Sequence, residues 1–238
     1  MNRQSTEWYP LRFAPVYKDY IWGGTRFINR LGRELDPAAI YAESWEIADH
    51  EAGHTAVLAG SLAGKTLSQI LTDSPAELMG EAYSGGNRFP LLLKYLDACH
   101  RLSVQVHPDD AMAAEMQLDD VGKTEAWYIV DKQPGAGLWL GLTDVFTHED
   151  LRAAIESGHI DKHLNWVEPE IGDCLFIPAG MVHALGDGLL VVEIQQNSNT
   201  TFRLHDWNRL TPEGKPRELH VDEALAAIRF DYQAADHH

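Results

Sequence analysis

The pair Gln105 and His107, with Glu125 and His183 farther along, constrains the fold more than any other feature of this sequence. Residues i and i+2 of a β-strand point to the same face, so Gln105 and His107 can face one cavity. The segment that begins at Gly172, GDCLFIPAGMVH, has the glycine and proline spacing of a turn that delivers a histidine at a strand end. Nitrogen and oxygen ligands of this kind suit a divalent cation such as zinc, manganese, cobalt or iron. We therefore predict a metal site built on a β scaffold.

Short segments rich in β-branched and aliphatic residues dominate the chain, with glycine and proline between them. Such a pattern is typical of β-strands joined by turns. Strands are expected at residues 44–48, 55–59, 89–97, 102–107, 125–130, 138–142, 165–167, 174–177, 189–195 and 201–204. Helices are expected from residue 66, around 75–79, and at 108–116, 147–157 and 222–228. The pattern predicts an all-β dominated fold, a β-barrel or jelly roll with helical insertions.

The composition excludes several kinds of partner. With a formal net charge of −17 over 238 residues, the chain would repel nucleic acid and anionic membranes, so neither is expected to bind. Two cysteines, Cys99 and Cys174, are too few for a disulfide framework and agree with a reduced cytoplasm. No apolar run is long enough to span a membrane, and residues 1–10 lack the apolar core of a signal peptide. We expect one cytoplasmic domain over residues 1–238, and a monomer, with oligomers left open.

Seven short strings in a fixed order give the chain a resemblance to a known family. They run from residue 20 to residue 207 as YIWGG, AESWE, FPLLLK, LSVQVHPD, GKTEAW, IPAGMVH and FRLHDW. The strings resemble type I mannose-6-phosphate isomerase, also called phosphomannose isomerase. Segments 105–125 and 172–187 resemble the two signatures of the cupin superfamily, with Asp187 where the second signature usually ends in asparagine.

The resemblance implies a cupin jelly-roll β-barrel, with helical insertions at about 108–118 and 147–157 and a C-terminal helix. Members of the family usually continue into a further β region, which is expected to be absent from this chain.

The resemblance also implies an activity and a cofactor. The expected reaction is that of a metal-dependent aldose–ketose isomerase, which interconverts mannose 6-phosphate and fructose 6-phosphate through a cis-enediol. The expected partner is therefore a small sugar phosphate. The expected cofactor is one divalent metal, zinc first, with manganese, cobalt or iron as the other candidates. The family match makes Gln105, His107, Glu125 and His183 the metal ligands, and it leaves open whether the ion polarises the sugar oxygens or mainly positions hydroxyl groups.

Further residues match functional positions of the family. Lys94 and Ser103 match positions of the phosphate site, where a dianion needs cationic and hydroxyl donors. Arg203 matches the active-site arginine and is assigned to charge stabilisation, because an arginine rarely loses its proton. Lys123, two residues before the carboxylate ligand, is assigned to proton transfer. By the same match, two residues are expected to line the sugar pocket: Trp22 and Glu43.

Two other functions stay open at this point. His107, His183 and Glu125 alone form the two-histidine, one-carboxylate set of an Fe(II)-dependent cupin oxygenase. That function would leave Lys94 and Arg203 without a purpose. A non-catalytic cupin that binds a sugar phosphate would keep the whole site without turnover. The isomerase is favoured because it gives a role to the cationic residues as well as to the metal ligands.

Overall fold

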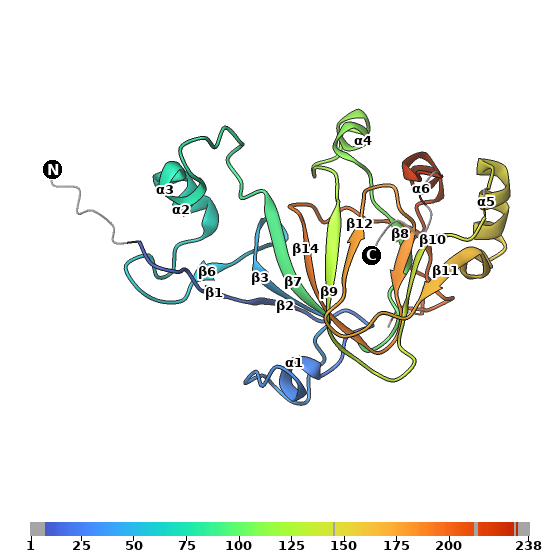
Figure 1. The fold of residues 1–238 in the computed structure, drawn as a ribbon, viewed down its shortest axis with the longest axis horizontal. Helices are drawn as coiled ribbons and strands as arrows, with labels where there is room; N and C mark the ends of the chain where they lie inside the picture. The colour runs from blue at the N-terminus through green and yellow to red at the C-terminus, as the bar shows by residue number, and fades with distance from the viewer. Residues whose placement is uncertain (1–7, 145, 212–213, 231, 233–238) are drawn as a thin grey trace.

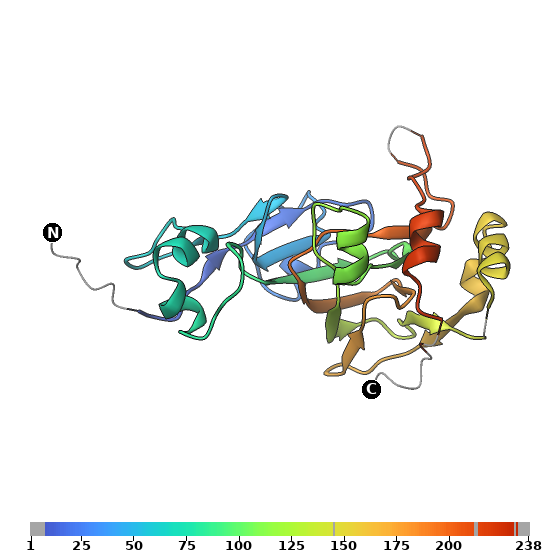
Figure 2. The ribbon, with the colours of Figure 1, turned by 90° about the horizontal axis from the view of Figure 1, so that it is seen from above.

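A computed structural model describes residues 8–144, 146–211, 214–230 and 232. Its centre consists of two antiparallel sheets, and the helices lie at the periphery (Figure 1). Seen from above, the N-terminal part of the chain extends to one side of the sheets, and α5 and α6 lie on the other (Figure 2). None of the helices in the described part combines the length and apolar character that a membrane crossing would need.

The larger sheet has six strands in the order β12-β9-β14-β7-β3-β2. Strand β14 lies in the interior; it pairs along its whole length with β7 on one side and from Leu189 to Gln195 with β9 on the other, where the register shifts once. The long apolar runs of these strands are typical of strands buried within a sheet. The strand bounds are β2 (Val16–Lys18), β3 (Glu43–Ile47), β7 (Leu91–Ala98), β9 (Glu125–Lys132), β12 (Cys174–Ile177) and β14 (Leu189–Gln196).

The second sheet has five strands in the order β11-β10-β13-β8-β15. Its strands are shorter, and register shifts interrupt the pairing of β10 with β11 and of β15 with β8. The bounds are β8 (Val104–Val106), β10 (Leu138–Leu142), β11 (Leu164–Val167), β13 (His183–Leu185) and β15 (Phe202–His205). A 3₁₀ turn, η1 (Ile160–His163), leads into β11.

The two faces of the five-stranded sheet have different partners. Its inner face and the inner face of the larger sheet share one apolar core, which includes Trp127 and Leu140. Its outer face packs against α5 (His148–Glu156) and α6 (Val221–Ala227). Because successive strand residues alternate between faces, Val104 and Val106 lie in the helix-covered core, and the residues between and beside them turn toward the other sheet.

Smaller elements lie around the six-stranded sheet as two separate two-stranded sheets and three short helices (Figure 1). They are β1 (Phe13–Ala14) with β6 (Ala56–Val57), β4 (Asp49–His50) with β5 (Gly53–His54), and the helices α1 (Arg26–Asn29), α2 (Leu67–Asp73) and α3 (Pro75–Met79). Helix α2 begins with a capping box in which Thr66 and Gln69 exchange hydrogen bonds, which satisfies two main-chain donors of the first turn.

The prediction of a mostly β fold is confirmed. The two main sheets are not hydrogen-bonded into a closed barrel; they remain separate sheets that share a core. Helix α4 (Asp110–Glu115) and α5 fall inside the predicted insertions, and a capping box of Thr147 and Asp150 begins α5. The strand expected at 55–59 is only the two-residue β6, because Gly60 turns the chain with a positive φ of 87°. The assignment of residues 1–238 to one domain stays a prediction.

Candidate metal centre and adjoining cavity

Polar side chains of the two sheets meet in the space between them. In the five-stranded sheet, the register aligns His183 of β13, Gln105 of β8 and Arg203 of β15 on neighbouring strands. In the six-stranded sheet, Glu193 of β14 is the register partner of Lys94 of β7. Buried charged groups on inner faces are costly unless they are paired or hold an ion. Their convergence therefore indicates a functional site.

His107, Glu125 and His183 form a fully buried cluster whose ligand atoms all lie within 4.8 Å of one another. His183 Nε2 lies 3.3 Å from Glu125 Oε1, and His107 Nε2 lies 3.6 Å from Glu125 Oε2. Among the described residues, neither Glu125 oxygen accepts a hydrogen bond of normal geometry. The Lys123 ammonium 2.9 Å from Oε2 compensates part of the charge, but a buried carboxylate without hydrogen bonds is unfavourable, and a metal cation would satisfy it. The donor set of two imidazoles and a carboxylate fits a divalent metal.

The hydrogen bonds of His183 fix which ring nitrogen is free. Its Nδ1 donates to the main-chain carbonyl of Met181 over 2.8 Å, which leaves the lone pair of Nε2 directed toward Glu125. Burial lowers the pKa of His183 to about 4. Burial, followed by the nearby ammonium of Lys123, lowers the pKa of His107 well below its usual value. Both rings are therefore neutral near pH 7, the form in which histidine binds metals.

Gln105, the fourth predicted ligand, lies beside the same cluster. Its amide nitrogen is 3.2 Å from His183 Nε2. The amide carries an oxygen acceptor on the same carbon as this nitrogen, so Gln105 can add an oxygen ligand to the set. The structure thus brings together the four residues that the sequence predicted as ligands.

Lys123 stands between this cluster and the adjoining cavity. Its Nζ lies 2.9 Å from Glu125 Oε2 and 3.2 Å from His107 Nε2. The segment between α4 and β9 that carries it has no regular structure, yet hydrogen bonds fix it in place. The Lys123 main-chain nitrogen donates to the carbonyl of Pro108, and that of Gly122 donates to Asp110 Oδ1. The ammonium of Lys123 is therefore held at a defined position.

Lys94 is enclosed by two carboxylates. Its Nζ lies 2.9 Å from Glu193 Oε1 and 3.6 Å from Glu43 Oε2. Burial alone would lower the pKa of Lys94, but Glu193 and Glu43 together raise it above its usual value. Burial alone would raise the pKa of Glu193, but Lys94 and then Lys123 lower it. Trp127 Nε1 also donates to Glu193 over 2.9 Å, so Glu193 belongs to a buried network of ion pairs and hydrogen bonds.

Burial, followed by the charge of Glu193, raises the pKa of Glu125. The pKa values of Glu193 and Glu125 are therefore shifted in opposite directions, because the ammonium groups of both Lys94 and Lys123 form ion pairs with Glu193, whereas that of Lys123 is the one paired with Glu125. A divalent ion bound at Glu125 would lower the pKa of Glu125, since an adjacent positive charge favours the ionised form.

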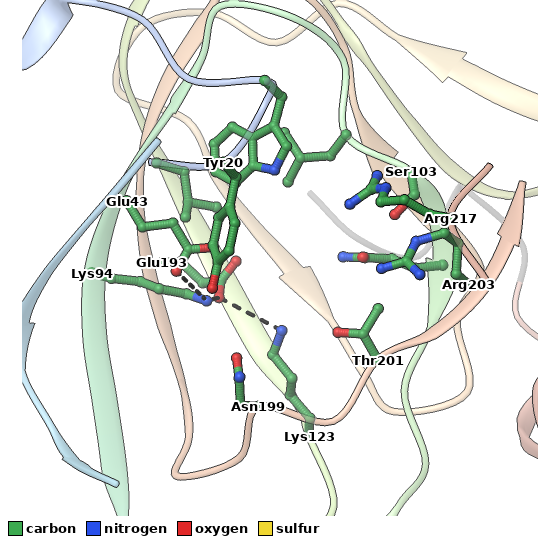
Figure 3. A pocket seen from close by; sticks show the side chains of 14 residues that line it. Tyr20, Glu43, Lys94, Ser103, Lys123, Glu193, Asn199, Thr201, Arg203 and Arg217 are labelled. Carbon is green, nitrogen blue, oxygen red and sulfur yellow. Dashed lines mark ion pairs between the residues drawn. The ribbon is translucent and has the colours of Figure 1, made fainter. Parts of the chain in front are cut away.

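A cavity of about 280 Å³ opens next to this network (Figure 3). Among the residues predicted from the sequence, those lining it are Trp22, Glu43, Lys94, Ser103, Gln105, Lys123 and Arg203. The cluster of His107, Glu125 and His183 does not line the cavity. Gln105 and Lys123 line the cavity and also contact the cluster, Gln105 at His183 and Lys123 at His107. The volume is near the lower end of the range for small-molecule sites, and the lining is mostly polar. The cavity suits a small, hydrophilic ligand.

Seven lining residues were not among the predicted site residues. They are Tyr20, Leu96, Leu102, Glu193, Asn199, Thr201 and Arg217. The first lies in the same short string as Trp22, so the string itself was a usable signal. Arg217 belongs to the loop after β15 and is part of no motif, so only the folded chain brings it to the cavity.

Comparisons with known proteins identify relatives of this chain. The family model described as "Phosphomannose isomerase type I, catalytic domain" matches residues 11–145. The chain is 43% identical to probable mannose-6-phosphate isomerase GmuF of Bacillus subtilis, covering 94% of this chain and 70% of that protein. It is also 43% identical to mannose-6-phosphate isomerase ManA of the same organism, covering 92% and 68%. The crystal structure of mannose 6-phosphate isomerase from B. subtilis superimposes with a TM-score of 0.86 at 39% identity, over 94% of this chain and 70% of that chain.

Proposed function

The chain belongs to the type I phosphomannose isomerase family, and we propose that it interconverts mannose 6-phosphate and fructose 6-phosphate through a cis-enediol. It is an isomerase with the mostly β, cupin-type fold that the sequence predicted. The observation that carries the proposal for this site is the cluster of His107, Glu125 and His183 beside a cavity lined by cationic side chains. An oxygenase would need the cluster but not the cations.

The reaction moves a proton between C1 and C2 of the sugar and requires stabilisation of the enediolate oxygens. The four ligands Gln105, His107, Glu125 and His183 would hold one divalent ion, which when bound supplies Lewis-acid chemistry toward these oxygens. Zinc is expected first, with manganese, cobalt or iron able to use the same nitrogen and oxygen donors.

Lys123 is the residue that we assign to proton transfer. Its amine lies 3.2 Å from His107 Nε2 and lines the cavity, so it reaches both the ligand cluster and the sugar. Hydrogen bonds of Gly122, Lys123 and Thr124 hold the main chain of this segment, and the ion pair with Glu125 places the amine, which limits the displacements that reduce catalysis strongly. Arg203, which stays protonated, supplies positive charge on the side of the cavity opposite Lys94 (Figure 3).

Lys94, Glu43 and Trp22 shape the sugar-binding space. Lys94 and Glu193 form a fixed pair on one side (Figure 3). Glu43 accepts a hydrogen bond of 2.6 Å from Trp45 Nε1, which orients its carboxylate at the cavity wall. Trp22 packs at 5.9 Å from the ring of Tyr20 and offers an apolar surface. An alternation of carboxylate, hydroxyl and aromatic groups suits a sugar, whose faces carry both hydroxyl groups and C–H bonds.

We propose that the substrate is a small sugar phosphate and that the protein is a cytoplasmic monomer, a compartment with which its two unpaired cysteines agree. The oligomeric state is checked by sedimentation of the purified protein.

A coupled assay tests the proposed function. The protein is freed of metal with a chelator, its metal content is measured, and the formation of fructose 6-phosphate from mannose 6-phosphate is followed before and after zinc, manganese or cobalt is restored. Activity that disappears and returns with the metal supports the proposal. Full activity in protein proven to be metal-free would contradict the metal's role, and oxygen uptake by the iron-loaded protein without isomerisation would favour an oxygenase.

A further inference from the structure

Two arginines face the cavity from the side opposite Lys94. Arg203 comes from β15, and Arg217 comes from the loop that follows it (Figure 3). Ser103 also lines the cavity and lies on the same side of it in Figure 3. Arginine is the residue that recognises phosphate best, because its planar group donates two parallel hydrogen bonds.

The charge on the two sides of the cavity is balanced differently. On the Lys94 side, the ammonium groups of Lys94 and Lys123 are already matched by Glu193, Glu43 and Glu125. An added dianion there would meet three carboxylates. On the other side, three arginines lie together, and the carboxylates that act on Arg203 among the described residues are those of Asp206 and the exposed Glu218, with Asp206 also pairing with Arg209 and Arg217. The arginine side of the cavity is therefore the side with an excess of positive charge.

The arginines also have unused hydrogen-bond donors. Arg217 donates from Nε and one terminal nitrogen to Asp206, and Arg203 donates from Nη1 to the carbonyl of Glu218 over 2.8 Å. Each guanidinium has a further terminal nitrogen, and Arg203 Nε is buried without a partner among the described residues. No side chain in the described part hydrogen-bonds to the Ser103 hydroxyl either. Donors gathered at one place without acceptors indicate an anionic ligand.

The proximity of the two guanidinium groups is itself unfavourable. Burial, followed by the charge of Arg217, lowers the pKa of Arg203. A phosphate group, which carries a charge of about −1.5 to −2 at pH 7, would offset this repulsion when it lies between them.

Asp206 keeps Arg217 in place. Its buried carboxylate accepts from Arg217 Nε over 2.7 Å and from a terminal nitrogen of the same group, and it also accepts from Arg209. Arg209 in turn donates to the carbonyl of Arg101 over 2.6 Å. This two-point contact fixes the guanidinium plane before a ligand arrives, which reduces the ordering cost of binding. Asp206 is a positioning residue for this side of the cavity.

We propose that Arg217, together with Arg203 and Ser103, receives the phosphate group of the substrate. The inference rests on the proposed function for the identity of the phosphorylated ligand. In this arrangement the phosphate does not contact Lys94, which instead forms ion pairs with Glu193 and Glu43. The sugar would lie across the cavity, with its phosphate at the arginines and its reacting carbons toward Lys123. Arg217 thereby sets the preference for a phosphorylated over an unmodified hexose.

The experiment compares Arg217→Gln, which removes the charge, with Arg217→Lys, which keeps the charge but loses the planar fork. Arg152→Gln is the matched control, because Arg152 is a partly exposed arginine of α5 that also pairs with an aspartate, Asp222. Thermal unfolding verifies that each variant is folded. The measured quantities are KM and kcat for mannose 6-phosphate, the inhibition constant of inorganic phosphate, and the ratio of kcat/KM for mannose 6-phosphate to that for mannose.

We expect Arg217→Gln to raise KM and the phosphate inhibition constant by about tenfold to a hundredfold, as for the loss of a charge-assisted hydrogen bond. Arg217→Lys should lie between the wild type and Arg217→Gln, and Arg152→Gln should match the wild type. Values for Arg217→Gln within twofold of the wild type would overturn the inference while leaving the isomerase intact. Calorimetry of the metal-containing protein with inorganic phosphate needs no turnover. If the wild type does not isomerise but binds phosphate through Arg217, the inference stands and the proposed function fails.

Discussion

Glu193 of β14 and Lys94 of β7 are register partners whose charged groups lie 2.9 Å apart inside the protein. Around this pair the inner face of the six-stranded sheet carries further charge, with Glu43 on β3 and Lys123 before β9. Buried ion pairs contribute little net stability, but breaking one leaves an uncompensated buried charge. The network is therefore better explained by the site it builds than by the stability it provides.

Replacing Lys94 with methionine should destabilise the protein. The substitution leaves the Glu193 and Glu43 carboxylates buried without their shared cation, which costs about 3–5 kcal/mol in the free energy of unfolding. Urea unfolding of the purified variant measures it. Lys65→Met is the control, because Lys65 and Asp73 form an exposed ion pair of 2.6 Å, and such pairs contribute under about 1 kcal/mol. Equal losses in the two variants would contradict the account of Lys94.

Loss of a ligand should remove the metal. In His183→Ala and Glu125→Gln, we expect less than one metal ion per chain by elemental analysis and isomerase activity reduced by about a hundredfold or more, since even residues around a metal's ligands change affinity by 10–100-fold. His100→Ala is the control, because His100 is exposed and does not line the cavity that adjoins the ligand cluster. A variant with full metal content and full activity would show that the altered residue is not a ligand.

Asp120 should matter although it lines no part of the cavity. Its carboxylate accepts from His50 Nε2 at 2.8 Å, from the main chain of Asn199 at 2.7 Å and from the hydroxyl of Thr200. The main-chain nitrogen of Ala52 donates to His50 Nδ1, so Nδ1 is an acceptor and the N–H of the ring is at Nε2, which faces Asp120. The contacts join the N-terminal part of the chain to the loop that carries Asn199 to the cavity.

Removal of these bonds in Asp120→Ala should cost about 2–3 kcal/mol of unfolding free energy and lower kcat/KM by about tenfold, because small displacements in a site reduce rate strongly. Urea unfolding and the coupled assay measure the two effects. Asp222→Ala, which removes an exposed carboxylate of α6, should change neither. An Asp120→Ala protein as active and as stable as that control would refute the role of this carboxylate.

The stability of the protein should fall as the pH drops through the range where His205 titrates. Burial lowers the pKa of His205, although the carboxylates of Asp161 and Asp206 oppose this and Arg209 and His159 add to it. The folded pKa thus lies below the unfolded value of about 6.5, so the unfolded state binds more protons between the two. The contribution of His205 is complete above pH 6.5 and is lost as the pH falls toward the folded pKa.

The comparison of the wild type with His205→Gln isolates this contribution. The free energy of unfolding, measured in urea between pH 7.5 and 5.5, should fall less steeply in the variant, by up to about 1.4 kcal/mol per pH unit. Parallel curves would show that His205 does not change its proton binding on unfolding.

The ligand set could be predicted because it depends on local rules. Gln105 and His107 share a strand face by the two-residue period, and the turn before His183 is encoded by its own glycines and proline. The pairing of Lys94 with Glu193 could not be predicted in this way, because it requires the register between two strands 99 residues apart. Local sequence patterns do not specify such a register.

Arg217 is a second residue whose position could not be predicted from local sequence patterns. It lies in a loop, in no motif and no periodic segment, and reaches the cavity only because Asp206 and the turn after β15 hold it there. The Trp207 and Asn208 residues of that turn both adopt positive φ values of 56°, which non-glycine residues rarely do. The closure of the sheets also depends on contacts between strands far apart in the chain, and the expected barrel is instead a pair of separate sheets.

The most direct measurement titrates metal-free protein with zinc while bound metal and the formation of fructose 6-phosphate from mannose 6-phosphate are recorded on the same sample. The account predicts that the rate rises in proportion to bound zinc and reaches its plateau at one ion per chain, with no such rise in Glu125→Gln. A rate that is independent of bound metal, or a protein that binds one ion per chain and forms no fructose 6-phosphate with any of the candidate metals, would contradict it.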